Sequence, residues 1–484
     1  MRVALFALAV LAACGGDGRP VFAPFIEVPP EGSDGYPYTG LDELVLEIAD
    51  SGRDVGRRSE SFAIGEPLEL TDLDYADDQV VHLSGRTRGV EVAYGRTCTV
   101  DIDPDEVDLA PHLYFSRTVK WGEGADPGAV ADGSVLAYSA PDGSGVFIGE
   151  GRVSRFDPLG GAFAEVPIDS IAARTGGILA AVPDGRAILV GGTVTADSDG
   201  VPLVEAIDPN EPPISTSRVE QQPGPRLVDH AAVTLVDGTV LVAGGRMQEE
   251  AGELPAVTRT AWLVRFGGGN TLDEPEQLVS QTVDPRYGHT MTRLGDDIGA
   301  AVVVIGGRGA DDLPVARPEL YRPLSRTFEL VDDTAALAVP RWNHRAVRLP
   351  DGSVLIIGGR TYDEKGEEVA ANAVERYDPV LGAFKGTNAV LRQQVDAVTD
   401  MAVVPMPDGR VLLIGGRRAD GKAVSNVLIA RFDPVNGQVD LSVTDPLERA
   451  RAGHSATILC DGTILVVGGG AGSERYNPPS AGRR

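Results

Sequence analysis

The chain has 484 residues, a formal net charge of −28 and an isoelectric point of about 4.6. A protein this acidic is repelled by nucleic acids and by anionic lipid surfaces, so neither is an expected partner. The length is enough for one large domain and a smaller one. Acidity is also common in soluble proteins, so the charge alone does not indicate a cation-binding site.

Residues 1–13 have the features of a targeting segment. Arg2 supplies a positive charge, and the apolar run from Val3 to Val10 is too short to span a bilayer, which needs about 20 residues. Leu11-Ala-Ala-Cys14 resembles a lipobox, where bacterial signal peptidase II cuts before a cysteine that carries lipid. The alternative is an ordinary secretory signal that is cut near Ala13.

The lipobox interpretation predicts a lipid anchor at Cys14. Each buried CH₂ contributes about 0.8 kcal/mol and one acyl chain binds only marginally, so the two or three chains of a lipoprotein give durable anchoring. Gly15 follows the cysteine, where some bacteria use Asp as an inner-membrane retention signal. We therefore expect the bacterial cell envelope, at the outer membrane, with membrane contact through the lipid anchor only.

Residues 14–40 are rich in Pro, Gly and polar residues, which is typical of a tether or extended arm. Residues 41–111 form a series of short strand patterns separated by turns. Leu44, Leu46 and Ile48, for example, alternate with polar positions. Short strands at this spacing predict a small β-sandwich of the immunoglobulin-like kind.

One unit recurs through residues 112–484. Its clearest copy is Asp351-Gly-Ser-Val-Leu-Ile-Ile-Gly-Gly-Arg360. Asp-Gly favours a type I′ hairpin turn, and the short Val- and Ile-rich run after it indicates a fully buried strand. The glycine pair marks a crowded position or positive φ angles. The pairs are Gly191-Gly192, Gly244-Gly245, Gly306-Gly307, Gly358-Gly359, Gly415-Gly416 and Gly468-Gly469, with a degenerate first copy at Gly149-Glu150.

Similar motifs on either side of the glycine pair recur from unit to unit. A third strand follows the glycine pair and ends in an aromatic-Asp-Pro turn, as in Glu375-Arg-Tyr-Asp-Pro379, and a short polar fourth strand comes next. Four strands with a buried second strand make one propeller blade. Four units also open with an arginine and then a histidine: Arg226 and His230, Arg286 and His289, Arg341 and His344, Arg451 and His454.

With a period of about 50 residues, these motifs resemble the kelch family, in the bacterial branch that it shares with galactose-oxidase-type propellers. The resemblance covers roughly residues 113–478. Seven units predict an all-β fold, a seven-bladed β-propeller after the small sandwich. The last unit stops after its third strand, so we expect the strand at 113–121 to complete the last blade and close the ring.

The cysteines leave two alternatives open. If Cys14 carries lipid, Cys98 and Cys460 remain as a pair in an oxidising compartment. They could form a disulfide that joins the small domain to the ring, or they could be two unrelated buried thiols, which is the interpretation that we favour from the sequence.

Some galactose-oxidase-type propellers are copper enzymes, whose site needs two histidines, two tyrosines and a cysteine crosslinked to a tyrosine. His230, His289, His344 and His454 occupy the same place in their units, which favours a structural hydrogen-bonding role between strands. Cys460 is at a hairpin turn, so the crosslinking cysteine has no candidate. We predict no catalytic residues, no metal and no cofactor. Related propellers include sialic-acid epimerases, so a carbohydrate-active enzyme of oxidase or epimerase type stays an alternative.

An arginine follows four of the glycine pairs: Arg246, Arg308, Arg360 and Arg417. They leave the buried strand at one end of the ring and are candidates for binding an anionic or carbonyl-rich ligand through their fork-like donors. The alternative is that each pairs with an acid of its own or the next blade. We expect a non-catalytic protein- or glycan-binding module, whose contact loops are 193–204, 247–258 and 361–373.

Overall fold

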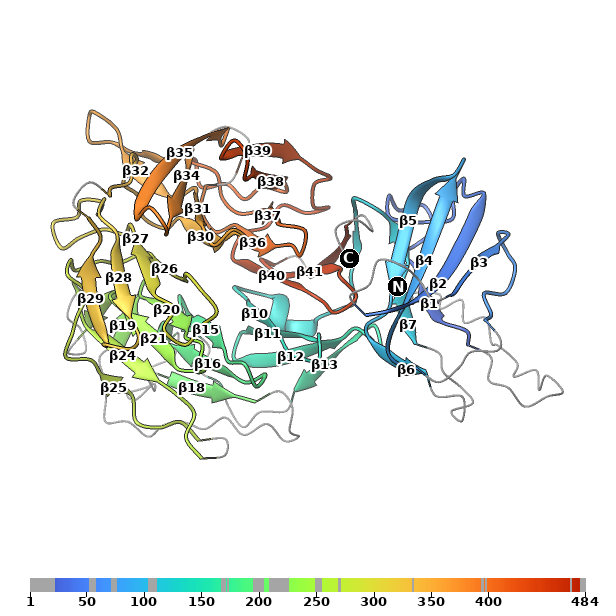
Figure 1. Ribbon diagram of the computed structural model, residues 1–484, viewed down its shortest axis with the longest axis horizontal. Coiled ribbons are helices and arrows are strands. Elements are labelled where there is room, and N and C mark those ends of the chain that lie inside the picture. The colour runs from blue at the N-terminus through green and yellow to red at the C-terminus, as the bar shows by residue number, and fades with distance from the viewer. Residues whose placement is uncertain are drawn as a thin grey trace.

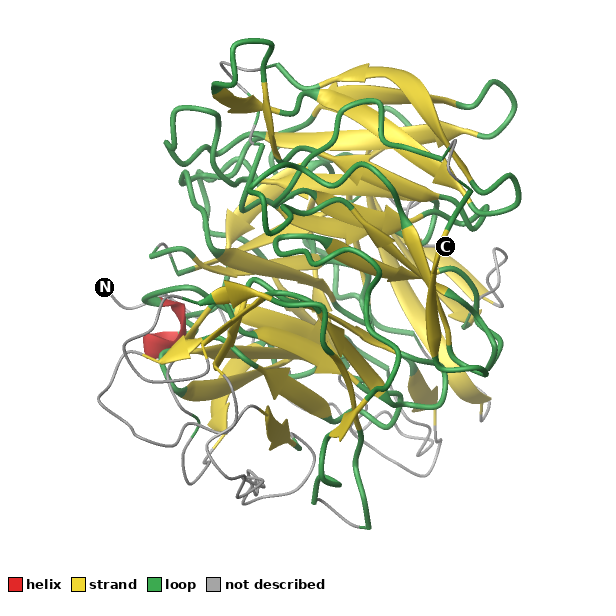
Figure 2. Ribbon diagram, turned by 90° about the vertical axis from the view of Figure 1, so that its left-hand side faces the viewer, coloured by secondary structure: helices red, strands yellow, loops and turns green. Residues whose placement is uncertain are grey.

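The computed structural model describes residues 22–51, 58–70, 76–102, 111–166, 171, 174–194, 204–208, 226–248, 255–268, 271–332, 335–392, 396, 398–470 and 472–478. Within these ranges the chain is all-β, with one 3₁₀ turn, η1 (Gly128–Ala131), as its helical element (Figures 1 and 2). The predicted signal segment 1–13 and the lipidation site Cys14 lie outside the described residues.

Small antiparallel sheets make up the described part of the repeat region, and in all but the last of the main sheets the strands are in chain order. The first three are β10 (Leu136–Ser139), β11 (Gly145–Gly149), β12 (Arg152–Asp157) and β13 (Ala162–Val166); β15 (Ile178–Ala181), β16 (Ala187–Val190) and β18 (Val204–Ile207); and β20 (Ala231–Thr234), β21 (Val240–Ala243), β24 (Ala261–Val264) and β25 (Glu276–Gln277). The fourth is β26 (Thr290–Arg293), β27 (Val302–Ile305), β28 (Glu319–Arg322) and β29 (Thr327–Leu330).

Three further sheets follow. They are β30 (Arg345–Arg348), β31 (Val354–Ile357), β34 (Ala373–Asp378) and β35 (Ala383–Val390); β36 (Ala402–Pro405), β37 (Arg410–Ile414), β38 (Val427–Asp433) and β39 (Gln438–Val443); and β40 (His454–Ile458), β41 (Ile464–Gly468), β42 (Ser473–Asn477) and β9 (Lys120–Glu123). Short accessory ladders join the loops: β14 (Arg174–Thr175) with β17 (Thr193–Val194), β19 (Arg226–Val228) with β22 (Arg246–Gln248) and β23 (Ala256–Val257), and β32 (Arg360–Tyr362) with β33 (Glu368–Ala370).

The sheets are arranged in a ring (Figure 1). The first strand of each sheet packs against the first strand of the next, in the order β10, β15, β20, β26, β30, β36 and β40, and β40 packs against β10. The second strands are buried along their whole length, as in β31 and β27, except that Arg410 at the start of β37 is partly exposed. The architecture is therefore propeller-like, with hydrophobic clusters between successive sheets.

The Asp-Gly turns have a different geometry from the type I′ turn that the sequence suggested. The loop Pro350-Asp351-Gly352 has three residues, because Leu349 N donates to Ser353 O at 2.7 Å and Gly352 N donates to Leu349 O at 2.9 Å. Only the glycine has a positive φ, of 83°. Asp351 instead uses its carboxylate to accept from Ser353 N at 3.0 Å. The type I′ prediction was wrong because this side-chain bond and a single left-handed glycine suffice for the longer loop.

A buried ion pair recurs at the entrance to the sheets. Arg341 Nη2 lies 2.7 Å from Glu375 Oε1, and the two side chains are 0% and 2% exposed. Arg341 also donates to the carbonyl oxygens of Gly358 at 3.1 Å and Ala373 at 2.7 Å. Glu375 in turn accepts from the backbone N–H groups of Ala338 and Val339. The pair therefore joins the incoming loop, the end of the second strand and the third strand.

The same buried pair is present in three other described sheets: Arg174 with Glu205, Arg286 with Glu319, and Arg451 with Glu474. In each case the arginine also donates to the carbonyl of a glycine that ends the second strand, namely Gly191, Gly306 or Gly468. We call these four pairs the arginine–glutamate clamps.

The repeated histidines explain the crowding at the glycine pairs. A Cβ on Gly306 would lie 2.7 Å from His344 Cε1, and a Cβ on Gly415 would lie 2.8 Å from His454 Cε1. Each histidine thus packs over the first glycine of the preceding sheet. In the sixth unit Met401 occupies this place. Its Cε is 3.0 Å from the position that a Cβ on Gly358 would take.

The ring is closed by β9, which pairs antiparallel with β42, so that Trp121 lies opposite Tyr476. Their rings are 4.9 Å apart, and Trp121 Nε1 donates to Asp445 O at 2.9 Å. The first part of the stretch 113–121 has another role. Residues 112–114 form β7, and β8 (Ser116–Arg117) is an edge strand of the N-terminal sheet. The expected boundary at residue 112 is therefore wrong, because these short strands complete the smaller unit.

The N-terminal unit contains a six-stranded sheet in the order β3 (Arg58–Phe62), β2 (Glu43–Asp50), β4 (Ala76–Thr87), β5 (Val90–Arg96) and β8, with β6 (Val100–Ile102) also paired to β4. Beside it β1 (Phe25–Glu27) pairs in parallel with β7 (His112–Tyr114). Phe22 and Leu113 are buried in the same hydrophobic cluster as the sheet residues Leu46 and Val81. Residues 22–27 are therefore part of the folded unit, and the prediction of a tether through residue 40 was wrong over this stretch.

Breaking one clamp should destabilise the ring strongly. Glu375→Gln leaves the buried guanidinium of Arg341 without its counter-charge, and we expect the free energy of unfolding in urea to fall by about 3–5 kcal/mol. Glu329→Gln is the matched control, because Glu329 pairs with Arg322 at the surface, with side chains 50% and 48% exposed. It should cost less than about 1 kcal/mol. Equal losses in the two variants would contradict a structural role for the clamp.

The buried histidines should make the protein sensitive to acid. Burial lowers the pKa of His344 and of His454 to about 3, from 6.5. Below pH 6.5 these histidines therefore bind protons in the unfolded chain but stay neutral in the folded chain. The free energy of unfolding then falls as the pH drops from about 6.5 towards 3. His344→Met, the residue type found at the equivalent position 401, should reduce the loss of Tm between pH 7 and pH 4.5. An unchanged pH dependence would show that His344 is not responsible.

Candidate functional site

The candidate arginines occupy equivalent positions on one face of the ring. We call the side at which the second strands end in glycine the glycine face. Arg246 is paired through its backbone with Val228 in the β19–β22 ladder. Bridges of the same kind join Arg308 to Tyr287, Arg360 to Trp342, and Arg417 to Thr399. The glycine pair thus turns the chain so that each arginine starts beside the segment that leads into the first strand of its own sheet. For Arg308 and Arg360, the paired residue directly follows an opening arginine.

Three of these arginines reach to the next sheet, and aromatic rings lie between them. The guanidinium of Arg246 is 4.9 Å from the centre of the Tyr287 ring. That of Arg308 is 4.7 Å from the Trp342 ring, and it donates to the Tyr362 hydroxyl. Arg360 Nη1 donates to Ala419 O at 3.4 Å. We call the seven residues the arginine–aromatic belt: Arg246, Tyr287, Arg308, Trp342, Tyr362, Arg360 and Arg417.

Each arginine of the belt also lies beside an acidic residue of its own unit, as the alternative interpretation expected. The pairs are Arg246 with Asp229, Arg308 with Asp312 at 3.7 Å, Arg360 with Glu368 at 3.3 Å, and Arg417 with Asp400 at 3.1 Å. The side chains of Arg246 and Arg417 are 39% and 47% exposed. Ion pairs this exposed contribute little to stability, so a ligand can replace the acid at small cost.

The sequence did not single out the aromatic members of the belt. A signal was present, because Tyr287 and Trp342 each directly follow one of the opening arginines, Arg286 and Arg341. Aromatic residues at a position shared by two units point to one common surface. Trp342 and Tyr362 belong to the sheet after that of Arg308. Their contact with Arg308 therefore depends on how neighbouring sheets pack.

The histidines lie between sheets, each packed against the sheet before its own. His344 Nε2 is 2.9 Å from Thr290 Oγ1, and His454 Nε2 is 3.1 Å from Ile414 O. Burial also lowers the pKa of His230 to about 4 and that of His289 well below its usual value. Among the described residues no three His, Cys, Asp or Glu side chains gather in a group that could hold a metal ion.

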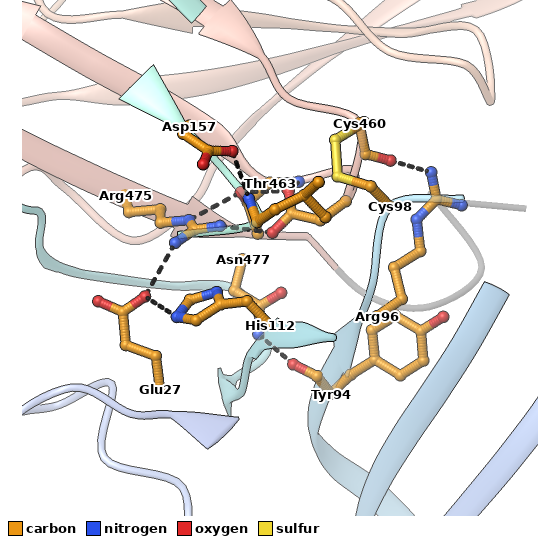
Figure 3. A network of polar contacts seen from close by, with 12 residues as sticks. Glu27, Tyr94, Arg96, Cys98, His112, Asp157, Cys460, Thr463, Arg475 and Asn477 are labelled. Carbon is orange, nitrogen blue, oxygen red and sulfur yellow. Dashed lines mark hydrogen bonds and ion pairs between the residues drawn. A yellow bond between two sulfur atoms is a disulfide. The ribbon is translucent and has the colours of Figure 1, made fainter. Parts of the chain in front are cut away.

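A second polar cluster lies where the N-terminal unit meets the ring (Figure 3). Arg475 of β42 donates to Asp461 at 2.5 Å and to Thr463 Oγ1 at 2.9 Å, and it lies 3.4 Å from Glu27 of β1. His112 Nε2 is 3.4 Å from the same carboxylate of Glu27. Burial raises the pKa of Glu27, while burial and the nearby charge of Arg475 lower the pKa of His112 to about 4.

Covalent and hydrogen bonds complete this junction. Cys98 and Cys460 form a disulfide, with their Cα atoms 5.0 Å apart, in place of the two separate thiols that the sequence favoured. Arg96 donates to Cys460 O at 2.7 Å beside it. Asn477 donates to Tyr94 O and Ser116 O at 2.7 and 2.8 Å. The junction is closely packed and held by partners on both sides, which indicates a structural connection between the two units.

Comparisons with known proteins add little to this geometry. No family model matches the chain, and no curated protein matches it. Among solved structures, that of YjhT is similar at 14% sequence identity, over 63% of this chain and 94% of that chain, with a TM-score of 0.46. We base no argument on a likeness of this size. The description of the protein as all-β and propeller-like rests on its own sheets.

The described residues include no helix with the length and apolar character needed to cross a membrane.

The disulfide should contribute measurably to stability. Replacing Cys98 and Cys460 together by Ser removes a link between positions 362 residues apart, and we expect a loss of about 2–4 kcal/mol in the free energy of unfolding. Reductant should lower the Tm of the wild type and leave the Tm of the double variant unchanged. Two free thiols in the denatured, unreduced wild type would contradict the disulfide.

Proposed function

We propose that the protein is a lipoprotein of the bacterial cell envelope whose ring is a seven-bladed kelch-type propeller. A small immunoglobulin-like sandwich precedes the propeller. The propeller binds a protein or glycan ligand and does not catalyse a reaction on it. The seven sheets of the described ring and its closure by β9 support this number of blades.

The observation that carries the proposal is the arginine–aromatic belt. Guanidinium groups donate in a fork that matches carboxylates and carbonyl-rich surfaces, and aromatic rings offer rigid contact area. Trp342 is buried and gives the belt a fixed base, whereas Arg246 and Arg417 are partly exposed. The loop 361–373 rises beside the belt as the β32–β33 hairpin. The central parts of the other two candidate loops, 195–203 and 249–254, lie outside the described residues.

The proposed anchor fits this arrangement. Since the folded unit already includes Phe22, only seven residues separate it from Cys14. Even fully extended, this stretch reaches no more than about 28 Å. A lipid on Cys14 therefore holds the small unit close to the membrane, with the ring beyond it.

The alternative function is a carbohydrate-active enzyme on the same fold. It requires converging acid–base groups or a metal set on one face. The belt offers hydrogen-bond donors and aromatic rings, and the carboxylates beside it, such as Asp229 and Asp400, are paired with its arginines. This arrangement favours ligand recognition over acid–base catalysis.

A soluble form beginning at Gly15 tests the proposal on an array of acidic and neutral glycans and on cell-envelope extract. Replacing both Arg360 and Arg417 by Ala should weaken capture at least tenfold, with unchanged circular dichroism and Tm. The control is Arg322→Ala, because Arg322 is exposed in β28, outside the belt. Equal capture by the belt variant and the wild type would contradict the proposed site. Turnover of a captured sugar would establish the enzyme instead.

A further inference from the structure

One unit has an arginine where four others have a small residue. Arg345 follows His344 at the start of β30 and pairs with Ile357, the residue before the glycine pair. The residues that occupy the same register in four other sheets are Ala231, Thr290, Ala402 and Ser455. Since those sheets form without a long charged side chain at this point, the fold does not require one in β30.

Arg345 lies close to the axis of the ring, at its glycine face. The first strands of the seven sheets pack against one another in a closed circle, so they are the innermost strands (Figure 1). Arg345 is exposed although it belongs to one of them. Burial nevertheless lowers the pKa of Arg345, and its charge lowers the pKa of His454, two sheets further round the ring. The solvent that reaches this guanidinium is therefore largely enclosed by protein.

The guanidinium of Arg345 has no acid of its own among the described residues. Its Nε donates to Met401 O at 3.0 Å, and it forms no ion pair with a described side chain. The charge of Asp400 acts on it, but that carboxylate is 3.1 Å from Arg417. Two arginines therefore share one carboxylate, which leaves one surplus positive charge. An enclosed charge without a counter-charge is costly, so a bound anion would stabilise it.

The backbone around the axis is interrupted at the same place. Gly288 N donates to Asp229 O, and Asn343 N donates to Gly288 O, both at 2.8 Å, which joins the third, fourth and fifth units. No such bond joins Asp400 to Asn343 in the described backbone. Arg345 lies between these same two units, the fifth and the sixth.

We propose that Arg345 binds the C-terminal carboxylate of a partner peptide. This inference rests on the proposed binding function and names the ligand class. The two oxygen atoms of a carboxylate match the two terminal nitrogens of a guanidinium. One surplus charge fits a carboxylate, whereas a phosphate monoester carries about two negative charges. Because the site is enclosed, the end of a chain reaches it more easily than a group in the middle of a chain.

The belt favours a peptide over an acidic sugar. Proteins commonly hold sugar rings by stacking them on open aromatic faces, but Trp342 is 3% exposed and lies beside the guanidinium of Arg308. The belt arginines can instead donate to carbonyl oxygens, as Arg360 does to Ala419 O. An extended peptide presents a carbonyl at every residue. Its last residues would therefore follow the belt towards Arg345.

Short peptides test the proposal by calorimetry on the soluble form beginning at Gly15. Acetyl-trialanine, with a free carboxylate, should bind with a Kd of about 0.1–1 mM, the strength typical of a ligand of this size. Acetyl-trialanine amide should bind at least tenfold more weakly. Acetyl-alanyl-glutamyl-alanine amide, which has its carboxylate on a side chain, should bind as weakly as that amide. Equal binding of all three, or tighter binding of methyl glucuronide, would overturn the assignment.

Variants of Arg345 separate binding from folding. Arg345→Ala should keep the Tm of the wild type, since alanine occupies the equivalent position 402, and should weaken acetyl-trialanine at least tenfold. Arg345→Lys keeps the charge without the fork and should bind with intermediate strength. Arg348→Ala, at the other end of β30, is the control and should bind as the wild type does. If Arg345→Ala does not fold, Arg345→Gln takes its place, and unchanged binding by either variant would overturn the proposal.

The result also separates this inference from the proposed function. If acetyl-trialanine does not bind, while replacement of Arg360 and Arg417 still abolishes capture from envelope extract, the peptide assignment fails and the proposed function stands.

Discussion

The arginine–glutamate clamp is the interaction on which the ring depends. A buried charge is costly unless it is paired and its remaining donors are satisfied. Arg341 meets both conditions, because Glu375 neutralises it and the carbonyls of Gly358 and Ala373 accept its other N–H groups. One side chain thereby holds the entry loop, the second strand and the third strand in a single geometry. The repetition of this arrangement ties four of the seven described sheets to their entry loops in the same way.

The glycine pair follows from the same geometry. Its first member gives a carbonyl to the clamp and leaves room for the histidine of the next sheet, as Gly306 does for Arg286 and His344. Met401 fills the corresponding position over Gly358, so a side chain of suitable size matters more there than a ring nitrogen. The departure at Glu150 differs in kind, because it places a charged side chain where the backbone favours glycine.

These constraints divide the glycine face into two regions of opposite character. Over the third to sixth sheets, the belt alternates guanidinium groups with aromatic rings, each arginine beside an exposed or half-exposed acid. Between the first and second sheets, a small cavity has an acidic rim. The clamps supply the rigid support that such a surface requires.

The sequence by itself determined the repeating unit, the buried second strands and the crowded glycine pairs, because each of these follows from a pattern within about ten residues. It also placed Arg246, Arg308, Arg360 and Arg417 at equivalent positions. Only the tertiary structure decided which charges are buried, as in the clamps, and which aromatic rings lie between the arginines of the belt. It also decided the Cys98–Cys460 disulfide and the parallel pairing of β1 with β7. The reason is physical: these contacts join residues from 23 to 362 positions apart, and no pattern within about ten residues encodes the distance between them.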